Sequence, residues 1–340
     1  MNGIQENKDL TGFNTFGVPA RARYYLKVSD ASTLSALRQE PMLRSIPIHF
    51  LGGGSNILFT REVDGLVIHC AIPGIRIETI NQSEALVTAG AGESWHGLVT
   101  HCVGAGLGGL ENLALIPGLC GAAPIQNIGA YGKELESVIE LVEGMDLRTG
   151  EQRTMTRQEC HFGYRDSVFK HAFEKKFFIS SITLRLTLKN HHINSGYEAL
   201  ASELGEEKIR QATIRDIYDA VVAIRRRKLP DPSITGNAGS FFKNPVVDRS
   251  TATALLTTNP VMPFYNIDNQ NVKIPAGWLI ERAGWKGKRI GNVGVHDRQA
   301  LVLVNHGNAT GMEVLEFSTR IMDDVFQKFG VALEREVNII

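Results

Sequence analysis

The stretch NLALIPGLCGAAPIQNIGAYG, from Asn112 to Gly132, sets how the rest of the chain is interpreted. It contains no charged residue and is apolar enough to be buried, yet its prolines and glycines interrupt any regular helix or strand. Glycine leaves backbone N–H groups accessible and lets another surface approach closely. A neutral, amide-rich loop of this kind suits a large, flat ligand with a polar edge. A glycine-rich connection packed in the core is the alternative.

A second glycine loop reads HFLGGGSNILF, from His49 to Phe59. Consecutive free N–H groups in a tight turn form an anion nest that suits a diphosphate. The loop is not the dinucleotide fingerprint, because position 57 is Ile and no helical pattern follows at once. It is not a P-loop either, since no Gly-Lys-Ser/Thr follows. Taken alone, it is weak evidence for a phosphate site.

Composition describes an ordinary globular protein. The 340 residues predict about two domains, and 43% hydrophobic and 21% charged residues are typical values. Lys+Arg and Asp+Glu both total 36, so no global field favours nucleic acid or a membrane as partner. An anionic ligand must therefore be held by local basic groups.

The chain carries no sign of export. Its start, MNGIQENKDLTG, lacks the apolar segment of a signal peptide, and no run has the pattern of a transmembrane helix. Cys70, Cys102, Cys120 and Cys160 are widely spaced, with no C-x-x-C. This spacing disfavours a zinc site or a disulfide scaffold and fits a reducing cytosol.

Hydrophobic periodicity predicts short strands in the first half and more helix in the second. Strands are expected over 21–28, 47–51, 65–70, 85–89, 177–188, 300–304 and 333–340, and helices over 29–40, 93–103, 213–228, 275–283 and 310–329. Short strands alternating with few helices indicate an α+β first domain. The polar run NHHINSG favours a boundary near Lys189, giving domains 1–189 and 190–340.

Two further motifs, GAGESWHGLV (90–99) and GNAGSFFKNP (236–245), complete a family resemblance. With the two glycine loops, they resemble the MurB family, the UDP-N-acetylenolpyruvoylglucosamine reductases of cell-wall synthesis, from about Asn14 to the C-terminus. The resemblance implies an α+β protein whose residues 1–189 form an FAD-binding domain of the vanillyl-alcohol-oxidase (PCMH) type, itself two subdomains. Residues 190–340 would form a smaller substrate-binding domain, with FAD between the two and the terminal strand returning to the active site.

The activity implied is NADPH-dependent reduction of the enolpyruvyl ether of UDP-N-acetylglucosamine to UDP-N-acetylmuramate. FAD would be bound non-covalently, with NADPH as co-substrate and no metal. The resemblance also leads us to expect a cytoplasmic monomer with no nucleic-acid or membrane partner.

Ser240, in GNAGSFF, has two interpretations. A hydrolase elbow requires glycine two residues after the serine, where Phe242 stands. A serine nucleophile also needs a His base and an acid, and His296 and His306 are available but not specified. The residues alone favour a turn serine that bonds locally. The resemblance instead implies that Ser240 donates a proton to the reduced enol ether.

Arg165 and Glu336 are the other catalytic candidates. An arginine in FGYRDS usually forms an ion pair, for instance with Asp166, but its planar fork also matches a carboxylate. Glu334 and Glu336 face the same side of the predicted last strand. The alternative to a functional role is that this side of the strand is simply exposed to solvent. The resemblance implies that Arg165 stabilises the enolate charge and that Glu336 positions the enol intermediate.

The remaining candidates come from family positions. The cofactor positions implied are Gly52, Gly53, Gly54, Ser55, Asn56, Ile116, Pro117, Gly118, Gly121, Ala122, Gln126, Asn127, Ile128, Gly129 and Arg225. The substrate positions implied are Tyr197, Lys228, Asn244, Tyr265, Lys273, Lys286 and Gln299. Tyr197 falls in the segment that marks the subclass with an extra substrate-capping loop.

Basic residues at the end of the third predicted helix, 213–228, are only partly explained by its helical position. Arg225, Arg226, Arg227 and Lys228 would favourably oppose the negative end of a helix dipole. The family pattern R-x-x-K-L-P matches Arg225 and Lys228 alone, so Arg226 and Arg227 are assigned to a solvated face. Asn338 stands where the family often has Arg, which removes a fixed charge.

Three rival functions stay open. A sugar or alcohol oxidase of the same FAD fold is the nearest, although such relatives often attach FAD through a histidine that the loop Gly52–Asn56 lacks. A non-catalytic nucleotide-sugar or flavin-binding module is the second. A serine hydrolase that uses Ser240 is the third.

Overall fold

The computed structural model describes residues 3–37 and 46–340. The chain forms two compact units, each assembled from separate parts of the sequence. Unit 1 comprises the N-terminal residues up to Lys8, Ala22–Gly53 and Asp64–Arg227, and unit 2 comprises Asp9–Arg21, Gly54–Val63 and Lys228–Ile340. The predicted boundary near Lys189 lies inside unit 1.

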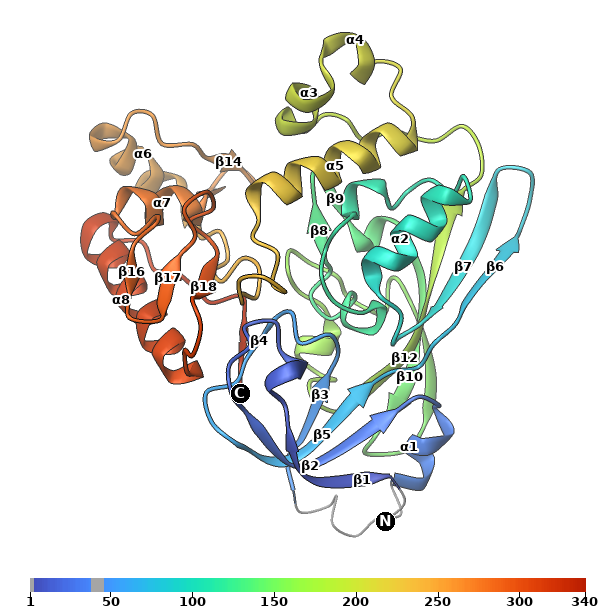
Figure 1. The fold of residues 1–340 in the computed structure, drawn as a ribbon. Coiled ribbons are helices and arrows are strands. Elements are labelled where there is room, and N and C mark those ends of the chain that lie inside the picture. Colours follow the sequence, from blue (N-terminus) through green and yellow to red (C-terminus); the bar gives the residue numbers. More distant parts are fainter. Residues whose placement is uncertain (1–2, 38–45) are drawn as a thin grey trace. The chain divides into compact units, whose positions relative to one another are not determined.

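Two sheets form the framework of unit 1 (Figure 1). The first has the order β1 (Ile4–Asp9), β2 (Arg21–Val28), β5 (Val63–Cys70) and β3 (Ile48–Leu51), with β3 parallel to β5. The second is antiparallel, in the order β11 (Gln152–Thr156), β10 (Ile139–Asp146), β12 (Phe177–Thr187), β7 (Glu84–Gly90) and β6 (Ile75–Thr79). Their apolar faces share one core that includes Leu66, Ile68, Val87, Ile182 and Leu184.

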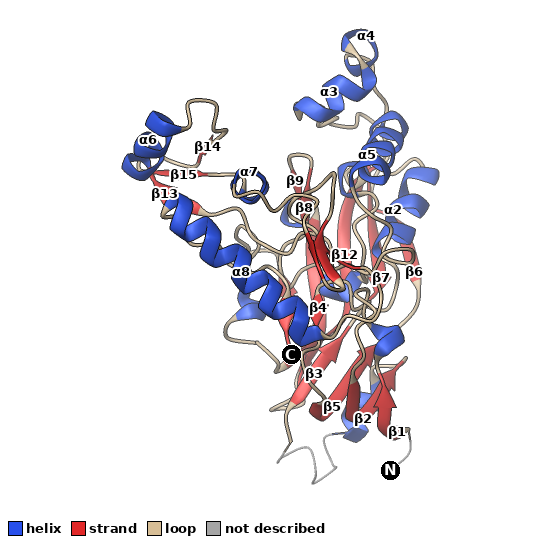
Figure 2. Ribbon diagram, turned by 60° about the vertical axis from the view of Figure 1, so that its left-hand side comes forward, coloured by secondary structure: helices blue, strands red, loops and turns tan. Residues whose placement is uncertain are grey.

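Helices and short segments complete unit 1. The helices are α1 (Ser32–Leu37), α2 (Trp95–Gly104), α3 (Glu198–Leu204), α4 (Glu206–Ile209) and α5 (Ile214–Lys228), whose last residue belongs to unit 2. The 3-10 turns are η3 (Glu111–Leu113), η4 (Cys120–Ala122), η5 (Leu135–Ser137) and η6 (Val168–Lys170), and β8 (Gly129–Ala130) pairs with β9 (Lys133–Glu134). Figure 2 shows α2 and α5 side by side, and their Thr100 and Tyr218 hydroxyls are 2.8 Å apart.

Sequence signals account for these two helices. The buried residues of α2 are the predicted apolar face, namely Trp95, Leu98, Val99, Cys102 and Val103. At the start of α5, the Thr213 backbone N–H and hydroxyl both donate to Asp216, which is the predicted near capping box. Periodicity and capping are local properties, so they are readable without the tertiary structure.

Unit 2 consists of small sheets and three helices (Figure 1). Its strands are β4 (Ile57–Leu58), β13 (Val246–Asp248), β14 (Tyr265–Asn266), β15 (Asn271–Lys273), β16 (Arg289–Ile290), β17 (Val293–Val295), β18 (Leu303–Asn305) and β19 (Asn338–Ile339). The sheet orders are β13-β15-β14, β16-β17-β18 and β19-β4. The turn η1 (Thr11–Phe13) and the helices α6 (Arg249–Thr258), α7 (Ala276–Arg282) and α8 (Gly311–Phe329) complete the unit.

The longest helix, α8, begins and ends where the sequence predicts. Thr310 and Glu313 form a reciprocal capping box, and Gly330 ends the helix in the left-handed conformation with φ 66°. Its apolar side packs on the rest of unit 2. There the rings of Trp285 and Phe317 of α8 are in edge-to-face contact, with centroids 5.2 Å apart. The α+β class expected from the sequence is therefore observed in both units.

Several predicted elements are wrong in detail. The last strand, predicted over 333–340, is reduced to β19, because residues 331–337 form only one isolated bridge, at Arg335. The buried strand predicted over 300–304 is β18, three residues later at its start. Pro275 caps α7 from outside rather than occupying its first position. The helix predicted over 29–40 is described only as α1, and residues 38–40 lie outside the described part.

In the described ranges 3–37 and 46–340, no helix is long and apolar enough to cross a membrane. Cys70, Cys102, Cys120 and Cys160 are free and buried. Burial raises the pKa of the Cys70 thiol to about 11, which keeps it protonated and unreactive at neutral pH.

Candidate active site

The two glycine loops lie against each other in unit 1. A Cβ placed on Gly53 would be 3.2 Å from the Gly118 Cα, and one on Gly52 would be 3.6 Å from the Ala122 Cβ. Contacts this close leave little room for a side chain. The glycines therefore bring two peptide backbones together and form a cradle between Gly52–Gly53 and Gly118–Ala122.

The long loop is anchored to the end of β7 and the start of α2. Cys120 and Gly121 donate backbone hydrogen bonds to Glu93 and Ala91, each at 2.9 Å, and the Trp95 N–H donates to Gly118 at 3.0 Å. A Cβ on Gly121 would lie 2.5 Å from the Ala91 Cβ. The motif GAGESWHG thus supports the loop, which is packed on one side as a core connection.

The cradle fits an anionic dinucleotide. Among the described residues, no hydrogen-bond partner is found for the backbone amides of Gly52, Gly53 and Gly118. Free amides on two adjacent glycine turns are the donors that a diphosphate requires. The central loop is a buried connection, as one interpretation of its sequence predicted, and its role as a ligand surface stays a prediction.

Leu115, just before Ile116 and Pro117, has a left-handed backbone with φ 56°. This conformation is unfavourable for a leucine by about 1–2 kcal/mol. The Arg225 Nε donates to the Leu115 carbonyl at 3.2 Å, and the His96 Nδ1 accepts from the Leu115 N–H at 3.0 Å. Arg225 is half-buried, and desolvation lowers the pKa of its guanidinium.

The second half of the long loop is held by Asn127, which is fully buried and has φ 43°. Its Nδ2 donates to Glu134 at 3.0 Å and to the Gly163 carbonyl at 3.1 Å, and its Oδ1 accepts from the Glu136 N–H at 3.0 Å. The Asn127 side chain is therefore engaged by the protein itself, and it links the loop to the segment that carries Arg165.

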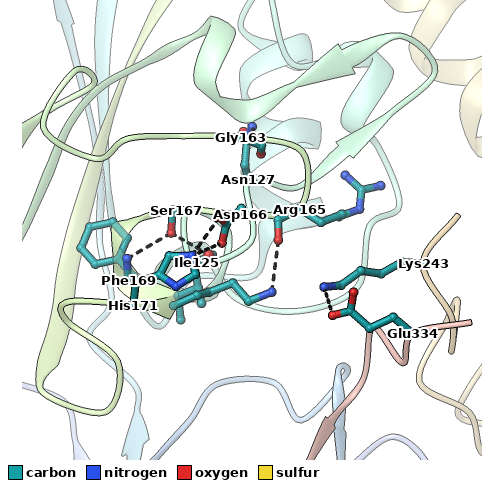
Figure 3. A network of polar contacts seen from close by, with 11 residues as sticks. Ile125, Asn127, Gly163, Arg165, Asp166, Ser167, Phe169, His171, Lys243 and Glu334 are labelled. Atoms are coloured by element: carbon teal, nitrogen blue, oxygen red, sulfur yellow. Dashed lines mark hydrogen bonds and ion pairs between the residues drawn. The ribbon is translucent and has the colours of Figure 1, made fainter. Parts of the chain in front are cut away.

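That segment is tied down at several points (Figure 3). Ser167 donates to the Ile125 carbonyl at 2.6 Å, and Asp166 lies 2.9 Å from the His171 Nε2. Arg165 has φ 54°, and its Nη2 donates to the Gly129 carbonyl at 2.9 Å. The Lys170 Nζ donates to the Arg165 carbonyl at 3.1 Å. The guanidinium is thus oriented toward the central loop.

Tyr197 contacts Tyr131 of the central loop. The Tyr131 and Tyr197 rings are 5.3 Å apart, edge to face, and the Asn112 amide donates to the carbonyls of Tyr131 and Asn194. Arg226 and Arg227 are exposed, as expected, and Arg227 pairs with Glu203. Asn112, at the start of the central loop, therefore links this loop to the segment that contains Tyr197.

Ser240, in unit 2, is half-buried and follows Gly239, whose φ is 68°. Phe241 and Phe242 after it are buried, and the Phe241 N–H donates to Leu301 at 2.7 Å. In the described part of the chain, no side chain is hydrogen-bonded to the Ser240 hydroxyl. His296 instead bonds its own loop, with Nε2 3.3 Å from Asp297. Since no described histidine is hydrogen-bonded to Ser240, the geometry does not favour the serine hydrolase considered above.

Glu336 lies beside the serine segment within unit 2. Its N–H donates to the Phe241 carbonyl at 2.8 Å, and Glu334 pairs with Lys243. Asn56 of the first glycine loop donates to the Glu336 carbonyl at 3.4 Å, and the Asn338 N–H donates to the Asn56 carbonyl at 3.1 Å. Asn338 thus replaces the family's frequent Arg with a neutral group that binds the glycine loop.

The substrate candidates of unit 2 lie on several different elements. Tyr265 and Lys273 are register partners on β14 and β15, and the Asn244 Oδ1 accepts from the Ala276 N–H at 2.9 Å. Lys286 is exposed and pairs with Glu281 at 3.0 Å, while Lys228 is exposed at the end of α5. Gln299 is half-buried between His296 and Val302.

One large cavity of unit 1 lies elsewhere. It has a volume of about 970 Å³, and none of the residues proposed from the sequence lines it. Its charges largely neutralise one another, since Arg185 pairs with Glu140 at 2.8 Å and Arg157 lies 3.6 Å from Glu136. Across the described residues, no group of three His, Cys, Asp or Glu side chains is arranged to hold a metal ion.

Sequence reasoning missed His96, Asn112 and Lys243. His96 stands in the quoted motif GAGESWHG, but nothing in its spacing distinguishes it from any helix-surface histidine. Its role depends on Leu115, and Lys243 likewise acquires its partner Glu334 from a distant part of the chain. Pattern analysis had no signal for either contact.

Comparisons with known proteins identify the family to which the chain is similar. Residues 231–340 match the family described as UDP-N-acetylenolpyruvoylglucosamine reductase, C-terminal domain, and residues 22–156 match an FAD binding domain. The chain is 44% identical to the UDP-N-acetylenolpyruvoylglucosamine reductase of Flavobacterium johnsoniae, over 99% of both chains. It is 47% identical to that of Chromobacterium violaceum, over 98% of this chain and 97% of the relative.

A solved structure has the same fold. The UDP-N-acetylenolpyruvylglucosamine reductase from Thermus caldophilus aligns over 99% of both chains, with a TM-score of 0.69 and 24% sequence identity.

Proposed function

The chain belongs to the family of UDP-N-acetylenolpyruvoylglucosamine reductases, and on that premise we propose how its own residues divide the reaction among them. It is an FAD-dependent oxidoreductase that uses NADPH to reduce the enolpyruvyl ether of UDP-N-acetylglucosamine to UDP-N-acetylmuramate, a step of peptidoglycan precursor synthesis. The observation that carries this conclusion is identity of 44–47% over nearly the whole length of curated relatives with that name.

The cradle of Gly52–Gly53 and Gly118–Ala122 is proposed to hold the FAD diphosphate. Support comes from its close backbone approach and its free amides. Ser55, Asn56, Ile116, Pro117 and the run Gln126–Gly129 are assigned to the same cofactor. Bound FAD supplies the hydride transfer that side chains cannot perform, from NADPH to the enolpyruvyl methylene.

Arg165 is proposed to bind the enolpyruvyl carboxylate. Addition of hydride to the methylene places negative charge on the neighbouring carbon and its carboxylate. A fixed guanidinium stabilises that charge as it develops. Support comes from the hydrogen bonds to the Arg165 side chain and carbonyl, which orient it before any substrate arrives.

Ser240 is proposed as the proton donor. Its O–H bond breaks as a C–H bond forms at the carbon beside the carboxylate, and solvent later returns the proton to the serine. Support comes from the burial of Phe241 and Phe242, which anchors the segment that carries the serine. Glu336 is proposed to help position the enol intermediate, and its backbone bond to Phe241 supports a shared location with Ser240.

Lysines are proposed to supply the charge that the two phosphates of the UDP-sugar require. Lys228, Lys273 and Lys286 are assigned this role, since the chain has no global positive field. Lys286 already pairs with exposed Glu281, so the substrate must compete for it. Tyr197, Asn244, Tyr265 and Gln299 are assigned neutral contacts to the sugar nucleotide.

We further propose that the protein works as a cytoplasmic monomer. Its free, buried cysteines support a reducing compartment. Light scattering of the purified protein tests the oligomeric state.

The visible spectrum tests the proposed function. The purified protein should be yellow, lose its flavin absorption when NADPH is added under nitrogen, and regain it when the UDP-enolpyruvyl sugar is added. Bleaching by a sugar or alcohol without NADPH would support the oxidase instead. A yellow protein that NADPH does not bleach would support a flavin-binding module.

A further inference from the structure

Leu115 is strained, and it stands directly before the proposed cofactor loop. Its φ of 56° places it in the left-handed region that leucine rarely adopts. Leu115 is followed by Ile116, Pro117 and Gly118, so its backbone direction determines where the Gly118 amide points. Something other than local preference must therefore hold this residue in place.

The N-terminal turn of α2 provides that support. The Trp95 Nε1 donates to the Leu113 carbonyl at 2.9 Å, and the Trp95 N–H donates to Gly118 at 3.0 Å. Between these two contacts, the His96 Nδ1 accepts from the Leu115 N–H at 3.0 Å. The His96 ring stacks on Tyr218 of α5, with centroids 5.9 Å apart and planes 12° from parallel.

We propose that His96 is a positioning residue for the cofactor site: its Nδ1 holds Leu115 in the left-handed conformation that presents the Gly118 amide to the diphosphate. This inference rests on the proposed function, because it takes the loop at Gly118 to be the FAD site. His96 does not contact the substrate or the reacting atoms in this proposal. It acts through the Leu115 N–H, while Arg225 donates to the Leu115 carbonyl, which belongs to the next peptide group.

The hydrogen bond requires one form of the imidazole. A nitrogen that accepts an amide hydrogen carries no proton, so His96 must be neutral, with its proton on Nε2. Protonation at Nδ1 would set two N–H groups against each other and break the contact. The loop should therefore lose its hold on FAD as His96 becomes charged.

The surroundings of His96 favour the neutral ring. Burial lowers the pKa of His96 first, and the positive charges of Arg226 and Arg225 on α5 lower it further. Tyr218 stacks on the ring, and its hydroxyl is 2.8 Å from the Thr100 hydroxyl, which donates to the His96 carbonyl. The held state binds fewer protons than the released state, so FAD affinity is retained above the ordinary pKa of about 6.5 and declines as pH falls below it.

The test compares FAD binding by apoproteins, measured by quenching of flavin fluorescence from pH 5.5 to 8.5. At pH 8, His96→Ala leaves the Leu115 N–H without its partner and should weaken binding roughly 10-fold. Asn places an oxygen acceptor near the position of Nδ1, so His96→Asn should restore most of the affinity. Because Asn does not titrate, the decline below pH 6.5 should also disappear. Exposed His101 on the same helix provides the matched control, His101→Ala.

The outcomes separate the possibilities. Wild-type affinity in His96→Ala would overturn the inference while leaving the FAD site intact. Equal loss in the Ala and Asn variants, or an acid decline that persists in His96→Asn, would also overturn it, since a merely structural histidine behaves that way. Thermal unfolding of each apoprotein shows whether a variant is folded. Failure of the wild-type protein to bind FAD at all would instead contradict the proposed function.

Discussion

Within residues 3–37 and 46–340, no side chain is hydrogen-bonded to the Ser240 hydroxyl, which suits its proposed role as a proton donor. Its neighbours Phe241 and Phe242 are buried, and the described residues provide no base bonded to its hydroxyl. A serine nucleophile would need such a base to be activated. A proton donor to a carbanion-like carbon needs only correct placement, because the substrate itself is the strong base.

Replacing this serine should separate the two half-reactions. In Ser240→Ala, reduction of the flavin by NADPH should keep its stopped-flow rate, because that step takes no proton from the serine. Reoxidation by the UDP-enolpyruvyl substrate should slow roughly 10²–10⁴-fold, the usual contribution of a positioned acid. Ser240→Cys should recover part of the rate, since a thiol also delivers a proton.

Ser233→Ala is the control for this experiment, since Ser233 is exposed and bonds only the nearby Asp231. Equal slowing of both half-reactions in Ser240→Ala would make Ser240 a structural or flavin-contacting residue. Arg165 and Glu336 variants should follow the Ser240 pattern if they serve the same intermediate.

Among the elements, the two glycine loops are proposed to bind the cofactor, and their close approach in space is a more specific feature than their composition. Gly53 and Gly118 approach so closely that a methyl group would lie 3.2 Å from the opposite Cα. The long loop is also fixed to the segment between β7 and α2, because Cys120 and Gly121 donate backbone hydrogen bonds to Glu93 and Ala91. A larger residue at Gly53 must therefore push the free loop surfaces apart.

Gly53→Ala should weaken FAD binding because the added methyl widens the cradle. Overpacking of a close contact costs about 1–3 kcal/mol, which corresponds to roughly 5- to 150-fold in affinity. Titration of the apoprotein with FAD measures the change. Gly104→Ala is the matched control, because Gly104 ends α2 with open space around its Cβ position. Equal affinities in the two variants would show that the cradle does not bind FAD.

At the scale of the whole molecule, the chain passes repeatedly between its two units. Asp9–Arg21 and Gly54–Val63 belong to unit 2 although their neighbours on both sides belong to unit 1. The first glycine loop is itself a crossing, with Gly53 in unit 1 and Gly54 in unit 2. Gly54 tolerates no side chain there, since its Cβ would lie 2.0 Å from the Phe13 carbonyl. Cutting the chain at Lys189 would therefore not yield two intact units.

FAD should leave the protein when the whole fold is lost. The loop Gly52–Asn56 contains no histidine, cysteine or tyrosine to which the flavin could be attached. The cradle offers hydrogen bonds and shape alone, and these disappear on unfolding. Acid precipitation should leave the yellow colour in the supernatant. Colour that stays in the pellet would indicate a covalent bond and favour the oxidase.

The sequence alone determined the elements that local rules control. Helices α2, α5 and α8 were predicted from apolar periodicity and capping residues, which act over three or four positions along the chain. The two glycine loops, the FAD domain and the reaction were also predicted, because long ordered motifs carry that information. The residue roles at Ser240, Arg165 and Glu336 stay predictions.

Only the tertiary structure decided which distant segments meet. The terminal residues 333–337 read as a strand, but they form a single bridge at Arg335 because the backbone opposite them is the short serine segment. Asp166 lies against His171, a partner that its position beside Arg165 did not suggest. Leu115 is held by His96 across 19 residues. Such contacts depend on how loops close in space, and no periodicity records them.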